Sequence, residues 1–134
     1  MTSDIGGTRS VLDASAVLAY LRREPGVGDV RRALASGAVI STVNLAEVHG
    51  RVATEGRSVD WTASRLGMVG LQVEPFVAED AAVTGSLLIP TRALGLSLAD
   101  RACLALAIRL ERTVLTADRD LARADVGVEV QVIR

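Results

Sequence analysis

The sequence predicts a three-layer α/β/α sandwich around a central, mainly parallel sheet of four to five strands. Short β-branched apolar runs recur along the chain, and segments with apolar residues at helical spacing lie between them. The runs are also too apolar to face water on either side of a sheet. Strands that alternate with helices in this way form parallel sheets covered on both faces. The 134 residues suit one hydrophobic core, so we expect a single domain over residues 1–134.

The expected strands are apolar runs of four to six residues, bounded by Gly, Ser, Asp or Pro. They cover residues 10–13, 38–42, 71–76, 113–117 and 128–133. The expected helices cover residues 14–24, 27–36, 44–55, 60–69, 78–88 and 98–112, and a further helix opens at Asp118. Pro25 and Gly26 separate the first two helices, and Pro90 should end or kink the fifth. The elements therefore follow one another as strand, helix, strand in the manner of an α/β domain.

Composition excludes several classes of protein. No window approaches the roughly 18 uninterrupted apolar residues of a membrane span, and the N-terminus lacks the basic-then-apolar order of a secretory signal. We therefore expect a cytoplasmic protein that does not enter a membrane. The single cysteine, Cys103, and the single histidine, His49, offer neither an internal disulfide nor a zinc site. A net charge of −1 gives no overall electrostatic sign of a nucleic-acid binder.

Four acidic residues occur where chains of this class place functional groups. Asp13 and Asp118 each close a strand and open a helix, while Glu47 and Asp100 fall within the first turn or so of their helices. In an open parallel sheet, ligands bind beyond the carboxyl ends of the strands, where helix N-termini also point. We therefore expect all four carboxylates to line that rim of the sheet.

Each acid also has a simpler interpretation as a helix cap. Asp13 and Asp118 can accept hydrogen bonds from backbone amides at a helix start. The stretch Ser97 to Asp100 fits a capping box, and Asn44 to Glu47 is a looser version of it. Capping is the better explanation for any one acid alone. The joint placement of four acids on four elements favours a shared site.

Carboxylates crowded on one rim raise each other's pKa unless a cation neutralises them. Hard oxygen ligands without thiol or imidazole neighbours suit Mg²⁺ or Mn²⁺, which keep several bound waters. Such a cation makes a bound water nucleophilic and stabilises charge on a phosphate under attack. The acids therefore predict a site for phosphoryl chemistry.

Four ordered motifs, "VLDASAVLAYL", "STVNLAEV", "GLSLADRACLALA" and "VLTADRDLA", resemble the PIN-domain family, and most of all the VapC-type ribonuclease toxins of type II toxin-antitoxin systems. The resemblance runs from about Ser10 to the C-terminus. It implies a metal-dependent endoribonuclease in which Asp13, Glu47, Asp100 and Asp118 form the acidic pocket around Mg²⁺ or Mn²⁺.

The resemblance also implies supporting residues. Ser15 and Thr116 stand where hydrogen bonds commonly support the pocket, and Asp120 is a candidate extra acid. Arg101 and Arg119 each neighbour a pocket acid and are candidate contacts for substrate phosphates; surface charge or ion pairing is an equal alternative. The sequence departs from the family pattern at Arg101, where a small residue is common, which leaves the fine geometry open.

The partners implied by the resemblance are an RNA substrate, a cognate antitoxin that blocks the groove and the acidic pocket, and a second copy of the chain in a homodimer. Tyr20, Leu21 and Trp61 would belong to an exposed apolar groove between early helices, with core packing as the alternative for Leu21. Two other functions stay open from the residues alone. One is a phosphohydrolase or DNA nuclease with the same pocket, and the other is a PIN-like module that binds RNA or protein without cutting.

Overall fold

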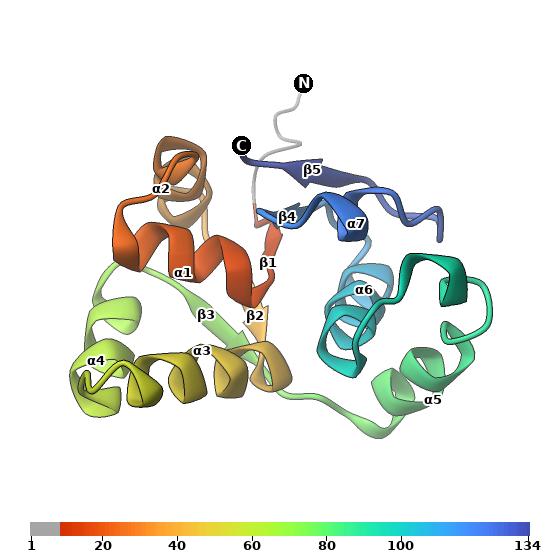
Figure 1. The fold of residues 1–134 in the computed structure, drawn as a ribbon, viewed down its shortest axis with the longest axis horizontal. Coiled ribbons are helices and arrows are strands. Elements are labelled where there is room, and N and C mark those ends of the chain that lie inside the picture. The colour runs from red at the N-terminus through yellow and green to blue at the C-terminus, as the bar shows by residue number, and fades with distance from the viewer. Residues whose placement is uncertain (1–8) are drawn as a thin grey trace.

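The computed structural model describes residues 9–134, and in this part of the chain five strands form one sheet (Figure 1). All four strand pairings are parallel, in the order β3-β2-β1-β4-β5. The strands are β1 (Val11–Leu12), β2 (Val39–Ser41), β3 (Gln72–Glu74), β4 (Val114–Thr116) and β5 (Val130–Val132). The predicted α/β class with a parallel sheet is confirmed, and its upper estimate of five strands is the correct one.

Helices connect the strands and cover the sheet (Figure 1). They are α1 (Ala14–Arg22), α2 (Val27–Ala35), α3 (Thr42–Thr54), α4 (Val59–Met68), α5 (Ala78–Ser86), α6 (Leu98–Leu110) and α7 (Arg119–Ala122), with a 3₁₀ turn, η1 (Arg92–Leu94), between α5 and α6. Within residues 9–134 no helix has the length and apolar character needed to cross a bilayer.

Two apolar clusters hold the layers together, one on each face of the sheet. Alternate strand residues divide between them because side chains of a strand point to opposite faces. Leu12 and Ile40 pack with α1, α2, α3 and α4, whereas Val11 and Val114 pack with α6. The layers therefore follow from the period of two in the short apolar runs.

Burial differs between the central and the edge strands. β1, β2 and β4 are buried throughout, as the sequence predicts. The edge strands differ from the prediction, since Gln72 and Val73 of β3 are exposed and β5 is only half-buried. An edge strand has a neighbour on one side only, so its apolar residues are less completely covered.

The strand order determines where the sheet offers a crevice. β1 lies in the middle, the chain builds outward through β2 and β3 on one side, and it returns to β4 and β5 on the other. The order thus reverses between β1 and β4, and a crevice opens beyond the carboxyl ends of such a pair. Asp13 follows β1 directly, and Asp118 follows β4 by two residues.

The helix boundaries differ from the expected ones by one or two residues, and the start of α3 and the end of α5 are examples. α3 begins at Thr42, where Ser41 accepts a hydrogen bond from the Val43 amide at 3.2 Å. Asn44 is therefore inside the helix and not its cap, and Glu47 lies in the second turn. α5 ends at Ser86, before Pro90, and a 3₁₀ turn follows the proline.

Candidate active site

The carboxylate of Asp13 is buried at the start of α1, with 3% of the residue exposed. Its Oδ1 accepts hydrogen bonds from the Ala16 amide at 2.9 Å and from the Ser15 hydroxyl at 2.7 Å. Its Oδ2 accepts one from the Thr116 hydroxyl at 2.5 Å. Asp13 is therefore a helix cap and a fully oriented carboxylate at once, so the two interpretations of this residue do not exclude each other.

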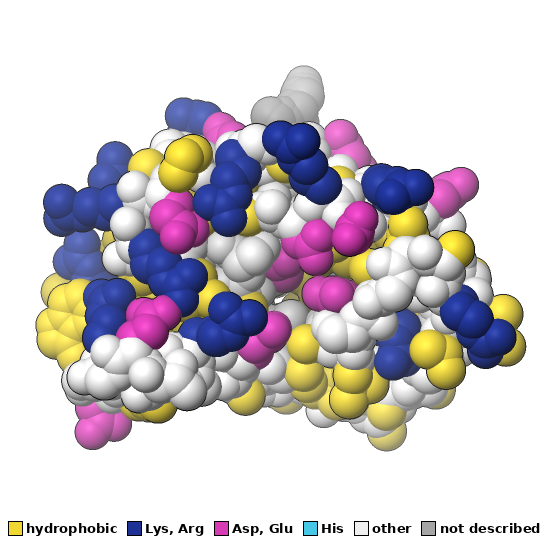
Figure 2. Space-filling view, in the orientation of Figure 1, with side chains coloured by type: hydrophobic (Ala, Val, Ile, Leu, Met, Phe, Trp, Pro, Cys, Tyr) yellow, Lys and Arg dark blue, Asp and Glu magenta, His cyan; other side chains and the backbone are white. Residues whose placement is uncertain are grey.

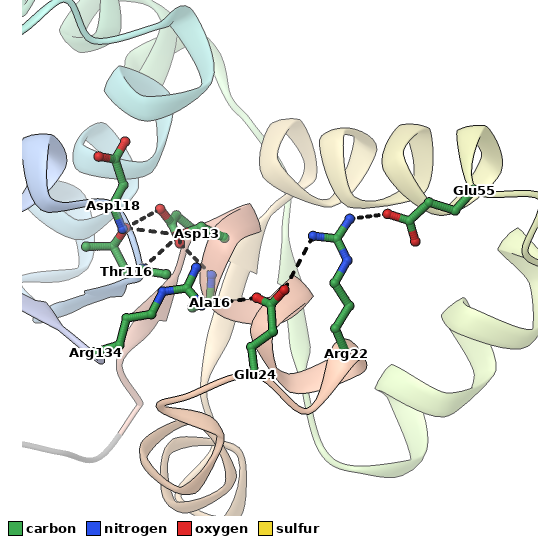
Figure 3. A network of polar contacts seen from close by, with 10 residues as sticks. Asp13, Ala16, Arg22, Glu24, Glu55, Thr116, Asp118 and Arg134 are labelled. Atoms are coloured by element: carbon green, nitrogen blue, oxygen red, sulfur yellow. Dashed lines mark hydrogen bonds and ion pairs between the residues drawn. The ribbon is translucent and has the colours of Figure 1, made fainter.

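Ser15 and Thr116 connect the start of α1 with the end of β4. Their hydroxyl oxygens lie 3.2 Å apart, and Ser15 Oγ also accepts a hydrogen bond from the Ala117 amide at 2.8 Å. Thr116 Oγ1 accepts one from the Asp118 amide at 2.9 Å. This network fixes the backbone that carries Asp118 relative to Asp13 (Figure 3). The two supporting residues lie where the sequence motif suggested.

Asp118 and Asp120 have different surroundings. Asp118 caps α7, its Oδ1 accepting a hydrogen bond from the Asp120 amide at 2.9 Å, and it lines the same hollow as Asp13. The side chain of Asp120 is exposed, lies 3.8 Å from Arg123 in an ion pair, and is not among the residues that line the hollow. Its backbone amide is thus the part of Asp120 that touches a pocket acid.

Asp100 and Glu47 approach from the other side of the crevice. Asp100 forms the capping box expected from the sequence: its carboxylate accepts a hydrogen bond from the Ser97 amide at 2.9 Å, and its own amide donates to Ser97 Oγ at 3.1 Å. Glu47 extends from the second turn of α3. α3 and α6 are packed against each other, which brings these two acids together.

The four acids surround a hollow of about 140 Å³. Acidic side chains gather around the middle of this face of the molecule (Figure 2). Eight residues line the hollow: Asp13, Ala14, Ser15, Leu18, Glu47, Arg51, Asp100 and Asp118. The structure thus brings together all four carboxylates that the sequence pattern singled out, from four different helices.

The hollow disfavours negative charge when no cation is bound. The pKa of Asp13 is raised to about 6, mainly by burial; the hydrogen bonds from Thr116, Ala16 and Ser15 act against this rise, and the nearby Asp100 carboxylate adds to it. Burial and, to a smaller extent, the Asp100 carboxylate also raise the pKa of Glu47, while Arg51 lowers it. A bound cation would remove this penalty by favouring the ionised carboxylates.

The donor set fits a hard divalent cation, because every acidic group in the hollow offers carboxylate oxygen. Within residues 9–134, however, no three His, Cys, Asp or Glu side chains are arranged to hold a metal ion directly. The carboxylates therefore fit a cation that keeps part of its water shell better than one held by protein atoms alone, and Mg²⁺ is of the first kind.

The sequence profile of the PIN domain matches residues 10–127. The chain belongs to the PIN domain family. A comparison with curated proteins finds no match.

Solved structures share the fold of this PIN domain at low sequence identity. A toxin-antitoxin complex from Klebsiella pneumoniae matches with a TM-score of 0.72 and 14% identity, over 93% of this chain and 98% of that one. DNA-bound VapBC from Salmonella typhimurium matches with a TM-score of 0.71 and 16% identity, over 95% and 99%. A VapC toxin of Mycobacterium tuberculosis that cleaves the sarcin-ricin loop matches with a TM-score of 0.70 and 17% identity, over 89% and 98%.

Two arginines near the acids of this PIN domain are placed differently from each other. Arg119 is exposed at the start of α7. Arg101 donates a hydrogen bond to the Thr84 carbonyl of α5 at 2.8 Å, so its guanidinium is directed to α5, and it does not line the hollow. A third arginine, Arg51, lines the hollow although the sequence motifs did not mark it as a phosphate contact.

Asn44 is a site residue that sequence reasoning missed. The residue is 1% exposed, and its Nδ2 donates a hydrogen bond to the Ala99 carbonyl at 3.1 Å. Asn44 lies one turn before Glu47, and Ala99 directly precedes Asp100. The bond thus holds two pocket acids of the PIN domain at a set distance. A polar residue inside a helix between apolar neighbours was the available signal, and a loose capping pattern obscured it.

Replacing Asn44 by Ala should destabilise the protein and loosen the packing of α3 against α6. The Ala99 carbonyl would lose a part-buried hydrogen bond from another helix, at a cost of about 0.5–1.5 kcal/mol. Urea unfolding followed by circular dichroism measures the loss. Replacing Thr54, an exposed residue near the end of the same helix, by Ala is the control, since its hydroxyl donates only to the Arg51 carbonyl within α3. Equal stability of the two variants would contradict the role of Asn44.

Proposed function

We propose that this PIN domain is a metal-dependent endoribonuclease that hydrolyses RNA phosphodiester bonds in the cytoplasm as the toxin of a toxin-antitoxin pair. The observation that carries the proposal is the hollow lined by Asp13, Glu47, Asp100 and Asp118, at the carboxyl ends of β1 and β4. The resemblance of the sequence to VapC-type toxins and the shared fold of several such toxins support the choice of RNA as substrate.

In this proposal Asp13, Asp100 and Asp118, with Glu47, hold Mg²⁺ or Mn²⁺ directly or through water. When bound, such a cation lowers the pKa of a water ligand and stabilises charge on the scissile phosphate. The chain itself supplies the orientation of the carboxylates. Asp13 is held by three hydrogen-bond donors, and the Asp118 amide is connected to it through the Thr116 hydroxyl.

Incubating the purified protein with structured RNAs and Mg²⁺ or Mn²⁺ tests the proposal. We expect metal-dependent cuts at internal positions that disappear when EDTA is added. Parallel reactions with DNA and with small phosphomonoesters identify the alternative substrates. Binding of RNA without products, or faster turnover of DNA or phosphomonoesters, would overturn the endoribonuclease assignment.

The proposed antitoxin site is a second hollow of about 240 Å³, lined by Tyr20, Leu21, Arg23, Arg31, Trp61 and Arg65. Trp61 is 56% exposed although it is large and apolar. Among the described residues, no ion pair within 4.0 Å involves Arg23, Arg31 or Arg65. We infer that the occupant is an antitoxin segment. Its apolar side chains would pack on Tyr20, Leu21 and Trp61, and its acidic side chains would pair with the three arginines.

Replacing Trp61 by Ala should weaken binding of the antitoxin by about tenfold or more, because large exposed aromatics dominate such interfaces. Calorimetric titration with a candidate antitoxin, sought as the product of a neighbouring reading frame and purified separately, measures this loss. Met68→Ala is the matched control, since Met68 is on the same helix, is 79% exposed, and does not line the hollow. Equal affinities of the two variants would place the antitoxin elsewhere.

We also propose that the protein forms a homodimer, as the family resemblance implies. Leu88, Ile89 and Leu98 flank η1 as exposed large apolar side chains, and Ile89 is 73% exposed. Exposed large apolar side chains mark an interaction surface when they form a contiguous patch. Sedimentation equilibrium of the wild type and of Ile89→Asp provides the measurement, with a monomeric wild type as the contradicting result.

A further inference from the structure

Arg51 is the one basic residue among the eight that line the acidic hollow. It lies four residues after Glu47 on α3, which is about 6 Å further along the helix axis, and its side chain is exposed. Arg51 lowers the pKa of Glu47, so its charge reaches into the site. The positive charge of Arg51 among these acids needs a more specific explanation than general surface charge.

Within residues 9–134, Arg51 forms no ion pair with the carboxylates around it. Helical spacing offers it Glu47 on one side and Glu55 on the other, at i−4 and i+4. Glu55 forms an ion pair with Arg22 of α1, and Arg22 is also 3.9 Å from Glu24 (Figure 3). In the part of the chain that the structure describes, no ion pair within 4.0 Å links Arg51 to either glutamate.

An anionic substrate needs positive charge at this hollow. The four carboxylates repel a phosphodiester chain, and a bound cation would offset that repulsion only near the phosphate under attack. The neighbouring phosphates lie outside its reach and still face the negative rim. A guanidinium binds phosphate oxygens in a bidentate manner and stays charged at any relevant pH.

We propose that Arg51 binds an RNA phosphate next to the scissile one and thereby sets the direction in which the RNA leaves the hollow along α3. This inference rests on the proposed function. The inference assigns the phosphate contact to Arg51 and not to the two arginines that the sequence suggested. Arg101 donates a hydrogen bond to α5, and Arg119 does not line the hollow.

The test measures binding of a single-stranded RNA to the non-cleaving Asp13→Asn protein over a range of salt concentrations. Adding Arg51→Gln should weaken binding about tenfold at low salt, as expected for one charge-assisted contact. The slope of log affinity against log salt should become shallower by about 0.7, the value for one phosphate contact on a single strand. Arg51→Lys should lie between the two.

Arg32→Gln is the matched control, because Arg32 is exposed on α2 and lines neither hollow. Mn²⁺ binding measured by calorimetry on Arg51→Gln in the otherwise unchanged protein should be equal to or tighter than that of the wild type, since a positive charge is removed. Weaker Mn²⁺ binding by Arg51→Gln would mean that Arg51 acts through the metal site, and would overturn the inference.

Failure of the inference differs from failure of the proposed function. If the wild type cleaves RNA but Arg51→Gln has the affinity and salt slope of Arg32→Gln, Arg51 does not bind the substrate and the proposed function stands. If the wild type binds RNA without cutting it, the salt series still shows whether Arg51 contacts an RNA phosphate. If the protein binds no RNA at all, both proposals are wrong.

Discussion

Asp13→Asn and Asp100→Asn should each reduce RNA cleavage by more than about a hundredfold, because loss of even an outer partner of a metal ligand costs 10–100-fold. Asparagine keeps the size of the side chain and one carbonyl oxygen. At position 13 that oxygen can still accept the hydrogen bond from the Ala16 amide. The charge is lost, together with the oxygen that accepts the hydrogen bond from the Thr116 hydroxyl. The helix cap is kept, so the variant separates the role of the carboxylate in the site from its role as a cap.

The measurement is the initial rate of cleavage of a defined RNA in Mg²⁺ and in Mn²⁺. Asp29→Asn is the control carboxylate, since Asp29 lies on α2 in an ion pair with Arg32 and lines neither hollow. Circular dichroism shows whether each variant is folded. Cleavage that survives in both pocket variants at the wild-type rate would disprove the proposed active site.

The stability of the metal-free protein should fall as the pH rises from about 4 to about 6. Burial raises the pKa of Asp13 from its ordinary 3.8 to about 6, so in this window the folded state holds a proton that the unfolded state has released. Above about pH 6 Asp13 is ionised in both the folded and the unfolded state. The folded protein then bears the full cost of burying this charge. The shift corresponds to about 3 kcal/mol, because one pKa unit is worth about 1.4 kcal/mol.

Urea unfolding in the presence of EDTA at a series of pH values measures this dependence. The difference between the wild type and Asp13→Asn isolates the contribution of Asp13, because all other carboxylates are common to both proteins. Asp13→Asn should be the more stable protein at pH 7.5 and should lose its advantage toward pH 4. A constant difference across this range would show that Asp13 titrates normally in the folded state.

The sequence allowed the fold class and the four pocket acids to be predicted, because both depend on local patterns. Short apolar runs and the helical spacing between them define the elements, and Asp13 and Asp118 stand at junctions between a strand and a helix. The capping box of Ser97 and Asp100 is also local, and the structure contains it.

Contacts between distant elements were beyond prediction. The hydrogen bond from Asn44 to the Ala99 carbonyl joins residues 55 positions apart, and the one from Arg101 to the Thr84 carbonyl depends on how α5 packs on α6. The start of α3 at Thr42 was missed because Ser41 and Asn44 are both good capping residues, and sequence alone does not choose between them.

By itself, the sequence determined which residues carry charge at the ends of elements and that these elements form a parallel sheet. The tertiary structure alone decided the strand order, and with it the crevice between β1 and β4 where Asp13 and Asp118 meet Glu47 and Asp100. It also decided which arginine lines that crevice: Arg51 does, and among the described residues Glu55 pairs with Arg22 and not with Arg51. The physical reason is that helix and strand periodicity are properties of neighbours in the chain, whereas the partner of a charge depends on which helices pack together.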